Sequence, residues 1–94
     1  MRNVVATIFL LGFALPAQAQ CYADYKAKRD NPLRLHYGVV EVTDQLCSRP
    51  ARLESSVRDR VSAGGWTLLN IVSVFDAEGL EQRRESAGEF FLRF

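Results

Sequence analysis

An apolar run near the N-terminus limits how much of this chain can enter a folded domain. Residues 4–15 are almost all apolar, and Arg2 places a positive charge before them. Ala17-Gln18-Ala19 follows as the small-x-small sequence after which signal peptidase cuts. A membrane-spanning helix needs about 20 apolar residues, more than this run provides. The order of these features therefore predicts a secretory signal peptide at residues 1–19.

The first cysteine, Cys21, lies close enough to this cleavage site to raise the question of lipidation. Lipoprotein processing prefers a small residue just before the cysteine and a leucine-like residue three positions before it, whereas Gln20 and Gln18 stand there. We therefore expect cleavage near Ala19, an unlipidated Cys21 and a mature chain that starts at Gln20. Such a chain meets the membrane only during export and then resides in the bacterial periplasm or is secreted.

The mature chain is small and contains two cysteines. Removal of 19 residues from 94 leaves 75, enough for one domain at residues 20–94. A domain of this size buries only about 60% of its unfolded surface. Cys21 and Cys47, 26 positions apart, enter an oxidising compartment, where a disulfide between them would contribute about 3–4 kcal/mol. An oxidising compartment disfavours free thiols, and a zinc site would need further Cys or His ligands. We therefore predict a disulfide rather than free thiols or a metal pair.

Charge argues against nucleic acid as a partner. One of the 12 basic residues lies in the predicted signal, so 11 basic residues remain against 11 acidic ones. The two signs are interspersed, and the only adjacent basic pairs are Lys28-Arg29 and Arg83-Arg84. Nucleic-acid-binding proteins concentrate basic residues on one face.

Three segments have the composition of β-strands. Apolar and polar residues alternate in residues 33–43 and 89–94, which predicts a strand in each. The parity of the first alternation changes near Gly38, where we expect a β-bulge. Residues 66–75 are rich in β-branched and aromatic residues of both parities, which predicts a central strand covered on both faces.

Helices are expected between these strands. The main one lies within residues 46–65, with Ser48 as a plausible N-cap, and its apolar stripe repeats every four residues: Leu53, Val57 and Val61. Residues 22–29 are expected to form a helical turn or two, and residues 76–88 either a short helix or a long hairpin loop. Together the segments predict an α+β fold: a small, mainly antiparallel sheet of about three strands with one amphipathic helix packed across it.

The junction between the main helix and the next strand reads SAGGWTLLNIVSVF. It resembles a family of small uncharacterised bacterial domains in which a helix ends in Gly-Trp-Glu-Leu and continues into a strand. Gly65, Trp66 and Leu68 match this motif, whereas Thr67 stands where the family usually has Glu. The resemblance covers roughly residues 35–94, including the final FFLRF. It implies a β-α-β-β fold and no known activity.

The sequence contains no recognisable catalytic pattern. His36 is the only histidine, and no Ser or Cys nucleophile accompanies it in a known motif. On a strand, His36 falls on the face opposite Leu35 and Tyr37. Carboxylates in residues 78–89 are mixed with arginines, as on a solvated surface. We therefore name no catalytic residue, metal ligand or cofactor, and expect a protein that is not an enzyme.

Aromatic residues are the candidates for contact with a partner. Tyrosine is enriched at interfaces, so Tyr22, Tyr25 and Tyr37 form one candidate surface with Phe91. Phe91 shares its strand face with charged residues and is either covered by the N-terminal segment or exposed as a docking anchor. Trp66 either fills the core beneath the helix end or forms the floor of a ligand pocket.

These observations favour a small exported non-enzymatic binding or accessory protein of the bacterial cell envelope, with another envelope protein as its partner. The alternative is a small-molecule carrier or sensor with a pocket between helix and sheet, lined by Trp66. A hydrolytic enzyme that uses His36 is the least favoured hypothesis.

Overall fold

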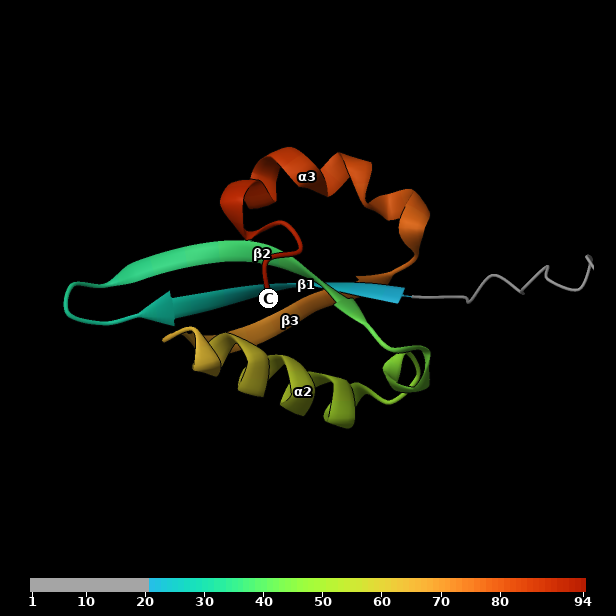
Figure 1. Cartoon of the computed structure of the whole chain (residues 1–94), viewed down its shortest axis with the longest axis horizontal. Coiled ribbons are helices and arrows are strands. Elements are labelled where there is room, and N and C mark those ends of the chain that lie inside the picture. Colours follow the sequence, from blue (N-terminus) through green and yellow to red (C-terminus); the bar gives the residue numbers. More distant parts are fainter. Residues whose placement is uncertain (1–20) are drawn as a thin grey trace, which may run out of the picture.

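The computed structural model describes residues 21–94, so the predicted signal peptide lies outside the described residues. Three strands form one antiparallel sheet in the order β2-β1-β3. The strands are β1 (Cys21–Arg29), β2 (Arg34–Val42) and β3 (Thr67–Phe75). Helix α2 (Pro50–Ala63) covers one face and α3 (Glu81–Ala87) the other, and the β1–β2 hairpin extends beyond both helices (Figure 1). The predicted α+β fold with a small antiparallel sheet is confirmed.

The central strand is β1, where a short helix was predicted, so that prediction was wrong. The strand pairs with β2 on one side and β3 on the other. Its side chains alternate in character, with Tyr22 and three charged residues on one face and four buried apolar residues on the other: Cys21, Ala23, Tyr25 and Ala27. This period of two is the strand pattern, but two alanines and a tyrosine make its apolar half inconspicuous.

The predicted disulfide between Cys21 and Cys47 is present, with the two Cα atoms 6.0 Å apart. It joins the first residue of β1 to the segment between the 3₁₀ turn Asp44–Leu46 and α2. Because Cys21 packs in the core with the helix stripe, the bond fixes the entry to α2 against the central strand.

Gly38 has a different role from the predicted bulge. The β1–β2 ladder runs without interruption from Cys21↔Val42 to Arg29↔Arg34. Gly38 lies opposite Tyr25, and a Cβ atom at Gly38 would lie 2.6 Å from Tyr25 Cζ. Glycine is therefore needed so that the tyrosine ring can cross β2. The parity of the apolar residues changes because both faces of β2 are covered at this point. Val39 and Val40 point to opposite faces and are both fully buried.

Strand β3 lies at an edge of the sheet, and the prediction that it is central was wrong. Its register against β1 shifts twice, so that Val72 and Leu69 have no partner on β1. Each extra residue reverses the side-chain parity. The two shifts explain why apolar residues occur at both parities, and Leu69 and Val72 are in fact exposed.

Helix α2 buries the predicted stripe of Leu53, Val57 and Val61. Its N-cap residue is Arg49, which makes no capping hydrogen bond through its side chain, rather than the predicted Ser48. Pro50 occupies the first turn, and Gly65 after the helix has a φ of 89°, a backbone conformation that glycine adopts readily.

The C-terminal segment is not the predicted strand. Residues 76–88 contain a 3₁₀ turn and α3, so the helical alternative holds there, and a second 3₁₀ turn spans Gly88–Phe90. Phe91 then makes one parallel bridge to Val39, and the Leu92 amide donates to the Val39 carbonyl oxygen at 2.8 Å. Leu92 has a φ of 58°, which interrupts the extended backbone. The segment therefore crosses the free edge of β2 instead of running along it.

Arg60 of α2 fixes this crossing. Arg60 Nη1 donates to the main-chain oxygen of Glu41 at 2.8 Å, and Nη2 and Nε donate to that of Phe94 at 2.9 and 3.3 Å. The end of β2 and the C-terminal segment are thereby joined to the same helix.

We predict that replacing Cys21 and Cys47 together by alanine lowers the free energy of unfolding by about 3–4 kcal/mol, because the unfolded chain loses its closed loop. Urea unfolding of the mature protein measures this change. Adding a reductant should destabilise the wild type by a similar amount and leave the double variant unchanged. Equal stability of the wild type with and without reductant would contradict the prediction.

Candidate functional site

The aromatic residues of the predicted surface do not come together. Tyr25 is fully buried beneath α2, whereas Tyr22 and Tyr37 lie on the opposite face of the sheet. Tyr22 stacks on Phe75 with ring centroids 6.0 Å apart. Phe91 lies at the β2 edge with the Arg84 guanidinium 4.5 Å from its ring centroid, so its cover comes from α3.

On the α3 face, a buried carboxylate anchors the helix to the sheet. Asp24 is 3% exposed and accepts hydrogen bonds from Tyr37 Oη at 2.7 Å, Ser73 Oγ at 2.7 Å and Arg83 Nε at 3.0 Å. Arg83 also donates to the Gly79 carbonyl oxygen at 2.7 Å. The sequence interpretation missed this cluster, whose only signal was one acidic residue between apolar neighbours in residues 21–25.

Burial on its own would raise the pKa of Asp24, but the hydrogen bonds from Tyr37, Ser73 and Arg83, with the Arg83 charge, together lower it below 3.8. Asp24 is therefore ionised at neutral pH, and both of its oxygens accept hydrogen bonds. A general base needs a pKa near the working pH and access to substrate. This geometry instead gives an internal ion pair that holds α3 in place.

His36 lies on the other face of the sheet, opposite Leu35 and Tyr37 as predicted, and packs among aromatic rings. Its ring stacks on Phe90 with centroids 3.6 Å apart and meets Trp66 edge-on at 4.2 Å. His36 Nε2 is 2.9 Å from the Tyr25 hydroxyl. Burial and the Arg29 charge lower the pKa of His36 to about 4, although Glu89 acts in the opposite direction. The imidazole is therefore neutral at neutral pH.

Trp66 is 8% exposed and belongs to the core cluster. The space between α2 and the sheet is filled by the helix stripe and the buried side chains of β1. The exposed part of Trp66 lines a hollow at the end of the sheet beside Gly64 and Phe94. Trp66 thus fills the core and also contributes to a surface depression.

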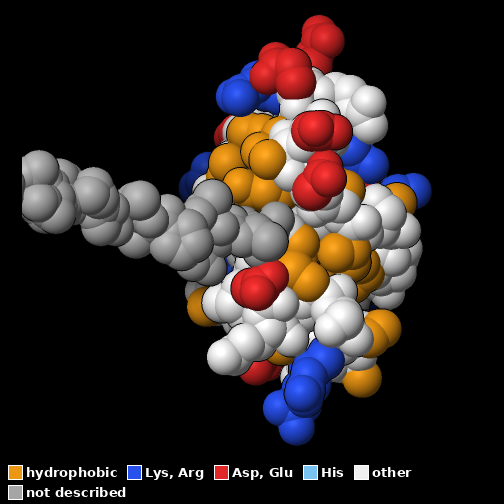
Figure 2. Space-filling model, turned by 90° about the vertical axis from the view of Figure 1, so that its right-hand side faces the viewer, with side chains coloured by type: hydrophobic (Ala, Val, Ile, Leu, Met, Phe, Trp, Pro, Cys, Tyr) orange, Lys and Arg blue, Asp and Glu red, His pale blue; other side chains and the backbone are white. Residues whose placement is uncertain are grey.

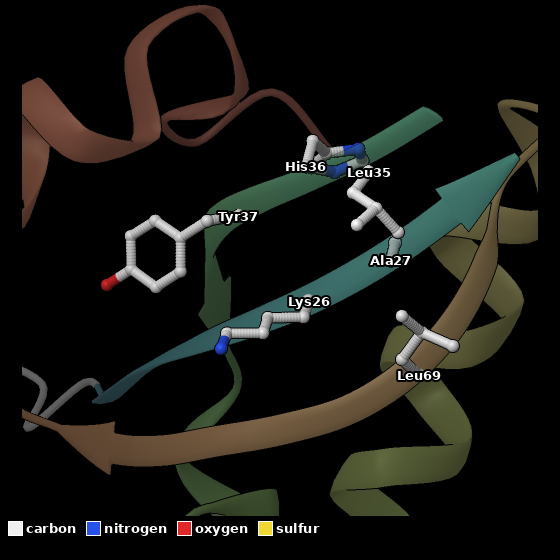
Figure 3. Close-up of a pocket in the computed structure, with 6 residues that line it drawn as sticks. All are labelled: Lys26, Ala27, Leu35, His36, Tyr37 and Leu69. Carbon is white, nitrogen blue, oxygen red and sulfur yellow. The ribbon is translucent and has the colours of Figure 1, made fainter. Parts of the chain in front are cut away.

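An open hollow lies on the α3 face, on the part of the sheet that α3 leaves uncovered. Its volume is about 290 Å³. Figure 3 shows Leu35 on β2 and Leu69 on β3, with the central strand between them. Leu35 is 67% exposed and Leu69 is 46% exposed. Ala27 and His36, whose side chains belong to the other face, also line the hollow. We call the surface around it the hairpin face, and define it by the other four lining residues: Lys26, Leu35, Tyr37 and Leu69.

On the end of the molecule shown in Figure 2, acidic side chains are most frequent in the upper half, where basic ones lie beside them, and a basic group lies at the bottom. Within residues 21–94, no group of three or more His, Cys, Asp or Glu side chains is placed to hold a metal ion. In the same part of the chain, no helix has the length and apolar character required to cross a membrane.

No family model matches the chain, and neither a curated protein nor a solved structure matches it significantly.

We predict that stability decreases as the pH falls from about 6.5 towards 4. In this range the unfolded chain protonates His36, with an ordinary pKa of 6.5, while the folded protein, with a His36 pKa of about 4, does not. The free energy of unfolding, measured by urea unfolding at several pH values, should therefore fall by less than about 1.4 kcal/mol per pH unit, the limit for one proton.

The matched control is a His36→Gln variant, which lacks this titration. Between pH 6.5 and 5 its stability should vary less with pH than that of the wild type. Parallel pH profiles of the two proteins would show that His36 titrates normally in the folded state.

Proposed function

We propose that this chain is a small exported binding protein of the bacterial cell envelope, without enzymatic activity, and that a partner protein docks on the hairpin face. The pattern of residues 1–19 and the disulfide between Cys21 and Cys47 support the export part of this proposal. The exposure of Leu35 and Leu69 around one hollow is the observation that supports docking there.

Exposed leucines at this site have an energetic cost that a partner removes. Burying a leucine side chain fully contributes about 1.5–3 kcal/mol. Single exposed leucines are common, but Leu35 and Leu69 line the same hollow, and Leu33 in the adjoining turn is also 64% exposed. Apolar side chains that line a hollow are typical of binding sites.

Charge indicates the chemistry of the partner. Lys26 is exposed at the hollow, beside the apolar part of the surface. A partner segment that inserts an apolar side chain between Leu35 and Leu69, with an acidic group beside it, would complement both features. Tyr37 contributes its ring, while its hydroxyl is already committed to Asp24.

Export is tested by the mass of the protein recovered from its own cell envelope. We expect a chain that begins at Gln20 and lacks two hydrogens because of the disulfide, with a further loss of ammonia if Gln20 has cyclised. A chain that retains residues 1–19 and both thiols in the cytoplasm would contradict the proposed location.

Docking is tested by photo-crosslinking in living cells. A benzoylphenylalanine placed at position 35 or 69 should crosslink to one discrete partner. The matched control is position 74, because Val74 is similarly exposed but pairs with Ala23 near the other end of the sheet. A Leu69→Gln change removes the burial of one leucine and should reduce crosslinking from position 35 about tenfold, whereas Val74→Gln should not change it. Equal crosslinking from positions 35 and 74, or none from either, would refute docking on the hairpin face.

A further inference from the structure

A second hollow, of about 420 Å³, lies where the β1–β2 hairpin meets the C-terminal segment. Three cationic and three aromatic side chains line it: Arg29, Arg34, Arg93, Trp66, Phe90 and Phe94. We call it the arginine hollow. Leu35 lies between it and the hairpin face and lines both.

Positive charge predominates in the arginine hollow. Arg29 and Arg34 lie directly opposite each other as the last pair of the β1–β2 ladder. Like charges at such a pair are destabilising. Glu89 is the one acidic residue that lines the hollow. Among the ion pairs of residues 21–94, none includes Arg29, Arg34 or Arg93. Glu89 therefore offsets only part of the positive charge, and no carboxylate of residues 21–94 forms an ion pair with Arg29 or Arg34.

Aromatic rings contact two of the three guanidinium groups. The Arg29 guanidinium lies 4.1 Å from the Trp66 ring centroid, a cation–π contact that orients it. Phe90 is fixed by its stacking on His36, and the Arg93 guanidinium lies 5.8 Å from the Phe90 centroid. Guanidinium groups offer a planar set of donors that matches a carboxylate or phosphate. A stacked arginine loses less conformational freedom when it binds such a group.

We propose that the arginine hollow binds a small organic anion that carries a planar ring. The carboxylate or phosphate of this anion accepts hydrogen bonds from Arg29 and Arg34, and its ring packs against Trp66 and Phe90. The volume of the hollow is within the range of small-molecule sites, and its lining is more polar than apolar, as a site for an anion requires. The anion also removes the electrostatic repulsion at the end of the ladder. This proposal is independent of partner docking on the hairpin face.

The chain provides its own probe, because Trp66 is the only tryptophan. Fluorescence of the mature protein should change saturably when phenylacetate or phenyl phosphate is added. Two further probes separate charge from ring contact, namely benzyl alcohol, which has the ring without the charge, and inorganic phosphate, which has the charge without the ring. Both should bind at least about tenfold more weakly. A comparison of phenylacetate with phenyl phosphate then shows which head group the arginines prefer.

Two variants test whether the fluorescence change reports binding in the arginine hollow. Arg34→Gln should weaken binding about tenfold, the scale of one charge-assisted hydrogen bond. Arg34 is exposed and is not in the contact with Trp66, so the variant should keep the wild-type circular dichroism spectrum. Arg52→Gln, a change at another exposed arginine, in the first turns of α2, is the matched control and should bind like the wild type.

Three results would overturn the proposal. The first is the absence of a saturable fluorescence change with either ring-bearing anion at millimolar concentration. The second is an equal fluorescence response to benzyl alcohol and phenylacetate. The third is an unchanged affinity of the Arg34→Gln variant. Since all measurements use the isolated mature protein, their outcome is separate from that of crosslinking in cells.

Discussion

The buried carboxylate of Asp24 determines which part of the sheet is covered and which part is open. A carboxylate that is 3% exposed must be compensated by donors, because an uncompensated buried charge is very costly. Arg83 meets this requirement, and its hydrogen bond to Asp24 holds α3 over this half of the sheet. A helix of seven residues covers only a limited area. The hairpin end of the same face therefore remains exposed, and the hairpin face results from this arrangement (Figure 1).

The C-terminal segment connects the two faces. After α3 it crosses the β2 edge at Val39 and reaches the other side of the sheet, where Arg60 binds the main-chain oxygen of Phe94. Phe90 and Phe94 thereby join His36 and Trp66 in one aromatic cluster. The crossing also occupies part of an edge that could otherwise pair with another strand. On the opposite edge, β3 carries two register shifts, an irregularity that discourages uncontrolled strand pairing.

The two proposed binding surfaces share one end of the molecule. The disulfide fixes the other end of β1, where Cys21 packs against the start of α2. At the hairpin end, Arg34 and Leu35 are exposed on β2 close to the turn. Because Leu35 lines both hollows, an anion in the arginine hollow would lie next to a protein on the hairpin face.

Local sequence patterns were sufficient for part of this structure. The stripe of Leu53, Val57 and Val61 located α2, and the cysteine spacing in a chain predicted to be exported indicated the disulfide. The alternation around Leu35 and Tyr37 located β2 and placed His36 on the opposite face. These features depend on residues close in sequence or on a covalent bond, so periodicity and chemistry are enough to predict them.

The tertiary structure decided what depends on distant partners. β1 is a central strand because β2 and β3 both pair with it, although its own alternation of alanines and charges is weak. The register shifts at Leu69 and Val72 arise from the fit of β3 to β1, and they made an edge strand resemble a buried one. Neither Asp24 with Arg83 nor Arg29 with Trp66 could be predicted, because each pair joins segments far apart in the chain. The sequence by itself determined the fold class and the disulfide, whereas long-range pairing decided which strand is central, how the chain ends and where both hollows lie.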